Sequence, residues 1–128
     1  MKKVLLMLIM LILNINIFSF SLNNLEFDES LKKEETKTKE YVLKNNTKEI
    51  KKYSIATNSN NVEVEPKTFV LSPQKEQKFY IKVLGKGKKG LNEYYLTIIE
   101  KNLNKDSSKK NPVYLNKVVN IKQKYFLK

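Results

Sequence analysis

Apolar residues recur at every second position through most of the chain, and this spacing restricts the fold more than any other feature. Phe79, Ile81 and Val83 show it most clearly. Side chains alternate between the two faces of a β-strand, so such a run predicts a strand with one buried and one wet face. After residue 22 no stretch keeps the i, i+3, i+4, i+7 spacing of an amphipathic helix. The sequence therefore predicts an all-β protein.

Turn signals divide residues 22–128 into seven to eight short strands. Pro66 and Pro73 bracket one short run, and neither fits the interior of a central strand because proline lacks an N–H. Strands of this number and length are typical of an antiparallel two-sheet sandwich of immunoglobulin-like type. We expect one such domain over residues 22–128. Its predicted core contains Tyr41, Leu43, Tyr53, Ile55, Phe69, Leu71, Phe79, Ile81, Leu96 and Ile98.

The first 21 residues have the pattern of a cleaved signal peptide. Lys2 and Lys3 precede an apolar run from Val4 to Leu13, and Ser19-Phe20-Ser21 has the small residues that signal peptidase prefers. The alternative is an uncleaved anchor, but asparagines interrupt the run, and a spanning helix needs about 20 apolar residues. We expect cleavage after Ser21, no transmembrane segment in the mature chain, and a location in the periplasm or cell envelope.

The composition excludes several kinds of chemistry. The chain has no histidine and no cysteine, so it lacks the common zinc ligands and the usual nucleophile–base pairs. We expect no enzyme activity, no cofactor and no metal. All 25 basic residues are lysine, and the net charge is +12. Arginine is the usual choice for bidentate phosphate contacts, so nucleic acid is not an expected partner. Weak attraction to anionic envelope surfaces remains an alternative to a simply solvated surface.

All three glycines fall between Gly85 and Gly90, in a stretch rich in lysine. The stretch lacks the Gly-Lys-Ser/Thr ending of a phosphate-binding loop and precedes a strand rather than a helix. A mobile hairpin loop is the better interpretation.

Several motifs together resemble the first domain of periplasmic pilus-assembly (PapD-like) chaperones. The central one runs Pro66-x-x-Phe69-x-Leu71-x-Pro73 and continues with Gln77-x-Phe79-x-Ile81. The others are Tyr41-x-Leu43-x-Asn45, Tyr53-x-Ile55, Glu93-Tyr94-Tyr95-Leu96-Thr97-Ile98 and Gln123-Lys124-Tyr125-Phe126-Leu127-Lys128. The resemblance implies a chaperone-like protein that binds extended polypeptide of a pilus or surface subunit by β-strand addition.

The resemblance has limits in the residues themselves. The family has two immunoglobulin-like domains, and this sequence covers one. The family also carries an arginine in its first strand that helps to grip the subunit's terminal carboxylate, whereas this sequence has no arginine. Tyr80 stands where the family usually has a basic residue. An envelope interaction or adhesion module on the same scaffold, and a truncated chaperone without a working site, are therefore the alternative functions.

The last predicted strand, Val113 to Phe126, contains the candidate binding residues. Leu115, Val119 and Ile121 share one face, and we expect them at an exposed edge, inserting into a partner's groove. Alternation alone equally allows this row to pack into the core. The resemblance places Lys124 where the carboxylate-gripping lysine belongs, with Lys122 in the alternative register.

Overall fold

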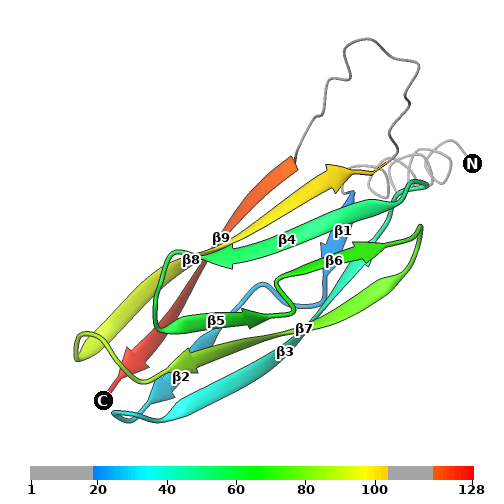
Figure 1. Cartoon of the computed structure of the whole chain (residues 1–128). Helices are drawn as coiled ribbons and strands as arrows, with labels where there is room; N and C mark the ends of the chain where they lie inside the picture. The colour runs from blue at the N-terminus through cyan, green and yellow to red at the C-terminus, as the bar shows by residue number, and fades with distance from the viewer. Residues whose placement is uncertain (1–18, 104–116) are drawn as a thin grey trace, which may run out of the picture.

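The computed structural model describes residues 19–103 and 117–128, and these residues form two packed β-sheets (Figure 1). Period-two alternation along each strand places one row of side chains between the sheets and the other row in solvent. The described residues contain nine strands: β1 (Phe20–Leu22), β2 (Asp28–Leu31), β3 (Thr36–Asn45), β4 (Lys51–Thr57), β5 (Val62–Glu65), β6 (Thr68–Leu71), β7 (Glu76–Leu84), β8 (Gly90–Asn102) and β9 (Lys117–Leu127).

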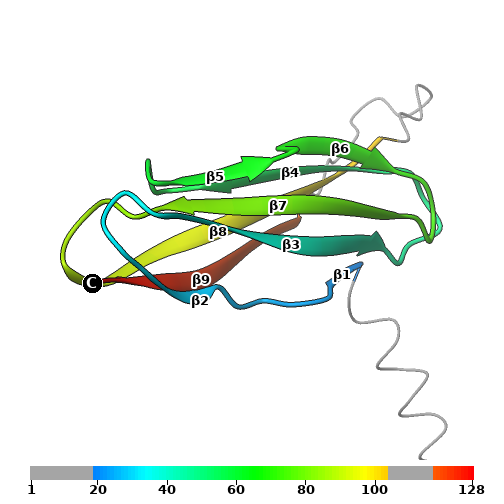
Figure 2. The same cartoon turned by 90° about the horizontal axis from the view of Figure 1, so that it is seen from below.

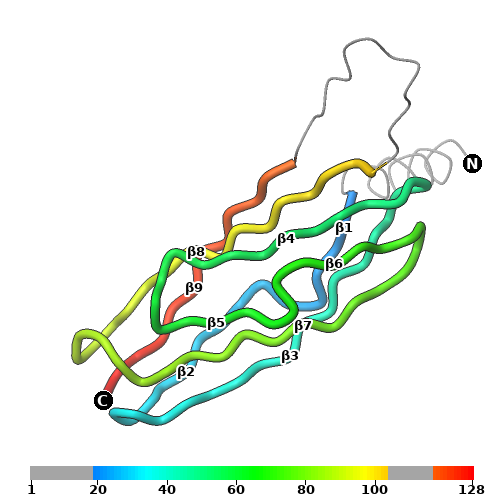
Figure 3. Tube along the Cα trace, in the orientation of Figure 1, coloured from blue at the N-terminus to red at the C-terminus, as the bar shows by residue number. Residues whose placement is uncertain are grey.

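One sheet has the strand order β1-β3-β7-β5, and the other has the order β2-β9-β8-β4-β6. The two layers are seen edge-on in Figure 2. Nearly all neighbouring strands are antiparallel, as predicted. The exception is β2, which pairs with β9 in parallel. The chain leaves the first sheet after β1 and joins the second at β2, a crossing that can be followed in Figure 3.

The predicted core is confirmed at nine of its ten positions, which are buried between the sheets. Phe69 is the exception, because it lies on the edge strand β6 and is only partly covered. Its ring still packs against Tyr53 and Phe79, with centroids 5.9 and 6.5 Å away. Tyr41 stacks on Phe79 across the β3–β7 pair at 5.4 Å. Aromatic contacts of this kind stabilise a core beyond the area they bury.

Asn45 joins two turns at one end of the sandwich. Its side chain is fully buried, and its Nδ2 donates to the carbonyls of Glu49 and Leu71 at 2.8 and 2.9 Å. The Oδ1 atom accepts hydrogen bonds from the N–H and hydroxyl of Thr47, at 3.0 and 2.6 Å. One side chain therefore satisfies polar groups of the β3–β4 turn and of β6, which would otherwise be buried without partners.

No helix in the described part of the chain is long and apolar enough to cross a membrane. Phe20, which the predicted signal peptide includes, lies in β1 and is largely buried. Its ring meets Tyr53 edge-on at 5.7 Å. Cleavage after Ser21 would remove two of the three residues of β1.

Candidate functional site: the open edge of β9

β9 is paired along its whole length on one side and along only part of it on the other. The antiparallel pairing with β8 runs from Lys117 to Leu127. The parallel pairing with β2 covers only Lys124–Leu127. Among the described residues, no strand covers the second side of Lys117–Gln123, which we call the open edge (Figure 1). Unpaired backbone groups on such an edge are able to accept an added strand.

The direction of the backbone groups on the open edge follows from one hydrogen bond. The N–H of Lys124 donates to the carbonyl of Phe27 at 3.1 Å, toward the β2 side. Backbone groups of successive residues point to opposite sides of a strand. Val118, Asn120 and Lys122 therefore direct their N–H and C=O groups to the open side. An antiparallel or parallel segment laid there would find a ready row of donors and acceptors.

The side chains of the open edge form an inner and an outer row. Val119 and Ile121 are partly buried and pack against the core from the edge. Val118, Asn120 and Lys122 are exposed on the outer face. Leu115, the third member of the predicted apolar row, lies outside the described residues. The insertion of this row into a partner's groove stays a prediction.

Lys117 lies at the start of the open edge, on the inner row with Val119. Its ammonium sits over the ring of Phe20, with 5.9 Å between Nζ and the ring centroid. A cation over an aromatic face is attracted by the ring quadrupole. This contact lets a charged residue occupy the inner row without facing the apolar core.

The two lysines predicted to grip a carboxylate differ in what they contact. Lys122 forms an ion pair with Glu93 on β8. The hydrogen bond from this ammonium to Glu93, together with the carboxylate's charge, raises the pKa of Lys122. A terminal carboxylate would have to compete with Glu93 for it. Lys124 has no ion pair within the described residues and is exposed. Lys124 is therefore the better placed of the two.

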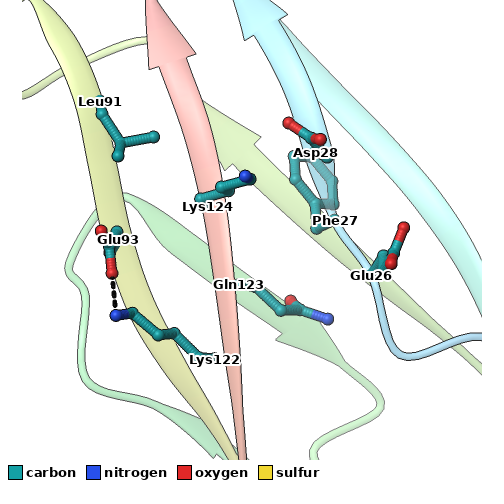
Figure 4. Close-up of a pocket in the computed structure, with 8 residues that line it drawn as sticks. All are labelled: Glu26, Phe27, Asp28, Leu91, Glu93, Lys122, Gln123 and Lys124. Atoms are coloured by element: carbon teal, nitrogen blue, oxygen red, sulfur yellow. Dashed lines mark ion pairs between the residues drawn. The ribbon is translucent and has the colours of Figure 1, made fainter.

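Both lysines line a hollow near the point where the pairing of β2 with β9 begins (Figure 4). Its volume is about 380 Å³, and Lys124 extends from β9 toward the β2 side. Three carboxylates, those of Glu26, Asp28 and Glu93, line the same hollow. Their charge opposes a bound anion, so any grip on a carboxylate here would be weaker than lysine alone provides.

A buried polar side chain fixes β9 at the end of the open edge. Gln123 is almost fully buried, and its Oε1 accepts a hydrogen bond from the Tyr94 hydroxyl at 2.7 Å. Its Nε2 donates to the carbonyl of Leu25 at 3.1 Å. Burial raises the pKa of Tyr94, which keeps the hydroxyl protonated as a donor. The sequence pattern did not reveal this role, because a glutamine in an alternating row reads as a solvent-facing residue.

The described residues contain no cluster of three or more acidic, histidine or cysteine side chains able to hold a metal ion. What the site offers chemically is hydrogen bonding and charge.

Comparison of the sequence finds no matching family model and no matching curated protein. Comparison of the structure finds similar folds. The YadV chaperone superposes with a TM-score of 0.66 at 9% identity, covering 86% of this chain and 52% of that one. The SafB chaperone of Salmonella enterica, solved with the SafA pilin, gives 0.65 at 12% identity, covering 88% and 56%. A PapD-like domain of human CEP192 gives 0.64 at 12% identity, covering 86% and 85%.

The chain thus spans about half the length of the chaperones that it matches. The matched proteins are chaperones and a PapD-like domain rather than enzymes. The motifs around Pro66 and Pro73 and the closing basic-aromatic segment predicted this outcome. The chain has the PapD-like immunoglobulin fold.

Proposed function

We propose that this protein is a non-catalytic, chaperone-like binder of extended polypeptide, acting in the periplasm or cell envelope on a secreted pilus or surface subunit. The single observation that carries the proposal is the open edge of β9, where Val118, Asn120 and Lys122 direct backbone groups away from β8. A subunit segment would add there as a further strand of the β2-β9-β8-β4-β6 sheet.

Main-chain hydrogen bonds give affinity in this mode of binding, and alternating side chains give specificity. The inner row, with Val119 and Ile121, offers partly exposed apolar surface at the edge. A subunit that lacks one strand of its own core would cover that surface. Lys124 would pair with a carboxylate of the added segment, at a strength that Asp28 and Glu93 reduce.

The fold supports the same proposal. SafB, which has this fold, is a chaperone solved in complex with a pilin. The low identity limits that support to the architecture, because one fold hosts many functions. The unpaired edge of β9 is the observation on this chain itself that supports the proposal.

A proline at position 120 tests the proposal directly. The Asn120 N–H points to the open side, so Asn120→Pro removes a donor that the domain itself does not use while blocking strand addition. Envelope extract is passed over the wild-type protein and the variant, and bound proteins are identified by mass spectrometry. We expect the wild type to retain a subunit and Asn120→Pro to lose it while its circular dichroism stays that of a folded β protein.

Asn120→Ala is the matched control. The Asn120 side chain accepts a hydrogen bond from the Thr97 hydroxyl at 2.7 Å, and both substitutions remove it. Only the proline removes the backbone donor. Equal capture by Asn120→Pro and wild type would exclude strand addition at this edge. Hydrogen exchange of the complex provides a second test, since binding should slow the amides of Val118, Asn120 and Lys122.

A further inference from the structure

Two separate segments are joined at one end of the sandwich, away from the Asn45 turn. The turn Lys32–Glu35 connects β2 to β3, and the loop Gly85–Lys89 connects β7 to β8. The N–H of Glu34 donates to the Gly85 carbonyl at 2.9 Å, and the N–H of Gly85 donates to the Glu35 carbonyl at 2.7 Å. A Cβ at position 85 would lie 2.2 Å from the Lys32 carbonyl oxygen, so only glycine allows this contact.

The loop is also held from β8 and β9. The Tyr125 hydroxyl donates to the carbonyl of Lys86 at 2.7 Å, and the Asn92 side-chain amide donates to the carbonyl of Lys88 at 2.7 Å. The sequence predicted a mobile hairpin loop here. The hairpin is wrong, because β7 and β8 belong to different sheets and the loop crosses from one layer to the other. These bonds also attach the loop at several points, a constraint that its glycine and lysine content did not reveal.

These two segments concentrate positive charge, and we call them the lysine end. Their only carboxylates belong to Glu34 and Glu35, and Glu35 lies 3.9 Å from the ammonium of Lys37. The segments carry five exposed lysines, none of which pairs with a carboxylate of the described residues: Lys32, Lys33, Lys86, Lys88 and Lys89. Because the two segments are joined, their lysines stay close together. Lysines gathered in this way attract anions more strongly than the same number of charges spread over the surface.

A hollow of about 480 Å³ lies within the lysine end. It is lined by lysines from both segments, by Leu127 and Lys128, by glycines of the loop and by one carboxylate, that of Glu34. Two exposed apolar side chains lie beside the lysine end, on β8 and β9. Leu91 and Phe126 are directly opposite each other on β8 and β9, one residue beyond the Gly90–Leu127 pair, and are 55% and 47% exposed. The end of the sandwich that bears the C-terminus in Figures 1 and 2 therefore combines lysine with exposed apolar residues.

We propose that the lysine end docks on an anionic lipid surface, with the ammonium groups on lipid phosphates and Leu91 and Phe126 at the level of the headgroups. A compact phosphate site needs converging donors that are at least partly buried, such as an arginine fork. Here every lysine of the two segments is exposed, and the chain has no arginine. An anionic membrane surface binds proteins through several basic side chains at once, together with apolar side chains that enter the headgroup region.

Co-sedimentation of the full chain with vesicles tests the proposal. Vesicles of phosphatidylcholine are compared with vesicles that also contain phosphatidylglycerol, so binding by the apolar N-terminal stretch contributes to both. We expect binding to increase with phosphatidylglycerol and to fall with salt. Each lysine near such a surface is worth about a fivefold change in partitioning, so Lys33→Gln/Lys86→Gln/Lys89→Gln should lose about a hundredfold.

The matched control is Lys48→Gln/Lys67→Gln/Lys75→Gln. It makes the same change in net charge at exposed lysines elsewhere. This control should bind the anionic vesicles nearly as the wild type does. Equal losses in the two triple variants would mean that bulk charge drives binding, and equal retention would mean that the lysine end is not involved. Either result overturns the proposal.

Two further arms identify the source of the phosphate and the role of the apolar pair. Inorganic phosphate should compete no better than chloride at equal ionic strength, and stronger competition would indicate a compact anion site instead. Leu91→Ser/Phe126→Ser should weaken vesicle binding without changing the sedimentation coefficient of the free protein. A change in self-association with vesicle binding intact would assign this pair to a protein contact and overturn its role at the membrane.

Discussion

The hydroxyl of Tyr53 donates a hydrogen bond to the carboxylate of Glu100 at 2.9 Å, inside the sandwich. The two residues are directly opposite each other in the β4–β8 pair, and both are buried. Burial raises the pKa of Tyr53 well above its usual range, and the hydrogen bond and negative charge of Glu100 raise it further. The phenol therefore remains a donor, and the carboxylate has a partner in a place where an unpaired one is costly.

Tyr53→Phe should lower the free energy of unfolding by about 1–3 kcal/mol, because it leaves the buried carboxylate without this donor. Urea denaturation at neutral pH measures the loss. Glu100→Gln and the double variant complete a cycle in which contacting residues should show a coupling above about 0.5 kcal/mol. Additive losses would mean that the hydrogen bond does not contribute to stability.

Stability should decrease above pH 10. Burial raises the pKa of Tyr41 to about 12, although the Gln123 side chain lowers it. The folded state thus holds this proton more tightly than the unfolded state, where tyrosine titrates near pH ~10. The stabilisation is complete below about pH 10 and is lost progressively as the pH rises toward 12. Urea midpoints at pH 9 and 11 should differ less for Tyr41→Phe than for the wild type; an identical difference would contradict the assignment.

Phe79→Ala should cost about 3–5 kcal/mol, since its side chain is fully buried against Tyr41. Tyr80 is the control, because it is the next residue of β7 and is 42% exposed on the outer face. Surface substitutions usually change stability by less than about 0.5 kcal/mol. Similar losses in Phe79→Ala and Tyr80→Ala, measured by chemical denaturation, would contradict the assigned faces.

Asn45→Ala should destabilise the fold by at least about 2 kcal/mol, because it leaves the buried carbonyl of Leu71 and other turn groups without their donor. Asn60→Ala is a suitable comparison. Asn60 is exposed in the β4–β5 turn, and its replacement should be nearly neutral. Thermal unfolding of the two variants gives the difference, and equal melting temperatures would show that the turns hold without the Asn45 side chain.

Cleavage after Ser21 remains a prediction, and sequencing of the N-terminus of the envelope form decides it. The expected first residue is Leu22. Cleavage there would leave β1 without Phe20, whose ring packs on Tyr53 and lies under Lys117. Recovery of Met1 in a membrane fraction would instead indicate an anchor.

The two-sheet architecture was predictable because alternation is a local property of the sequence. Rows such as Phe79, Ile81 and Val83 determine which face is buried, whatever the partner strand. Pro66 and Pro73 indicated where the chain leaves one strand and begins another. The buried face of nearly every long strand followed from these two signals.

Long-range pairing was not predictable from such signals. Nothing in Asp28–Leu31 shows that it joins β9 in parallel, and this pairing decides how much of β9 stays open. The buried polar residues were missed for the same reason. Gln123 and Glu100 look solvent-facing until the residues opposite them, Tyr94 and Tyr53, are known. The role of the candidate lysines stays a prediction, and Glu93 as the partner of Lys122 could be found only from the strand register.

The pairing of β2 with β9 also governs when the domain is able to fold. It brings Asp28 against Lys124 and Leu31 against Leu127, so residues from the two ends of the domain close the sandwich. Contacts between such distant segments form slowly, because the loop entropy is lost before the contacts are gained. A polypeptide emerging N-terminus first contains no β9 until every other strand of the domain has been made. Until then the sandwich has no strand to close it, so the earlier strands wait for the last one before the domain becomes stable.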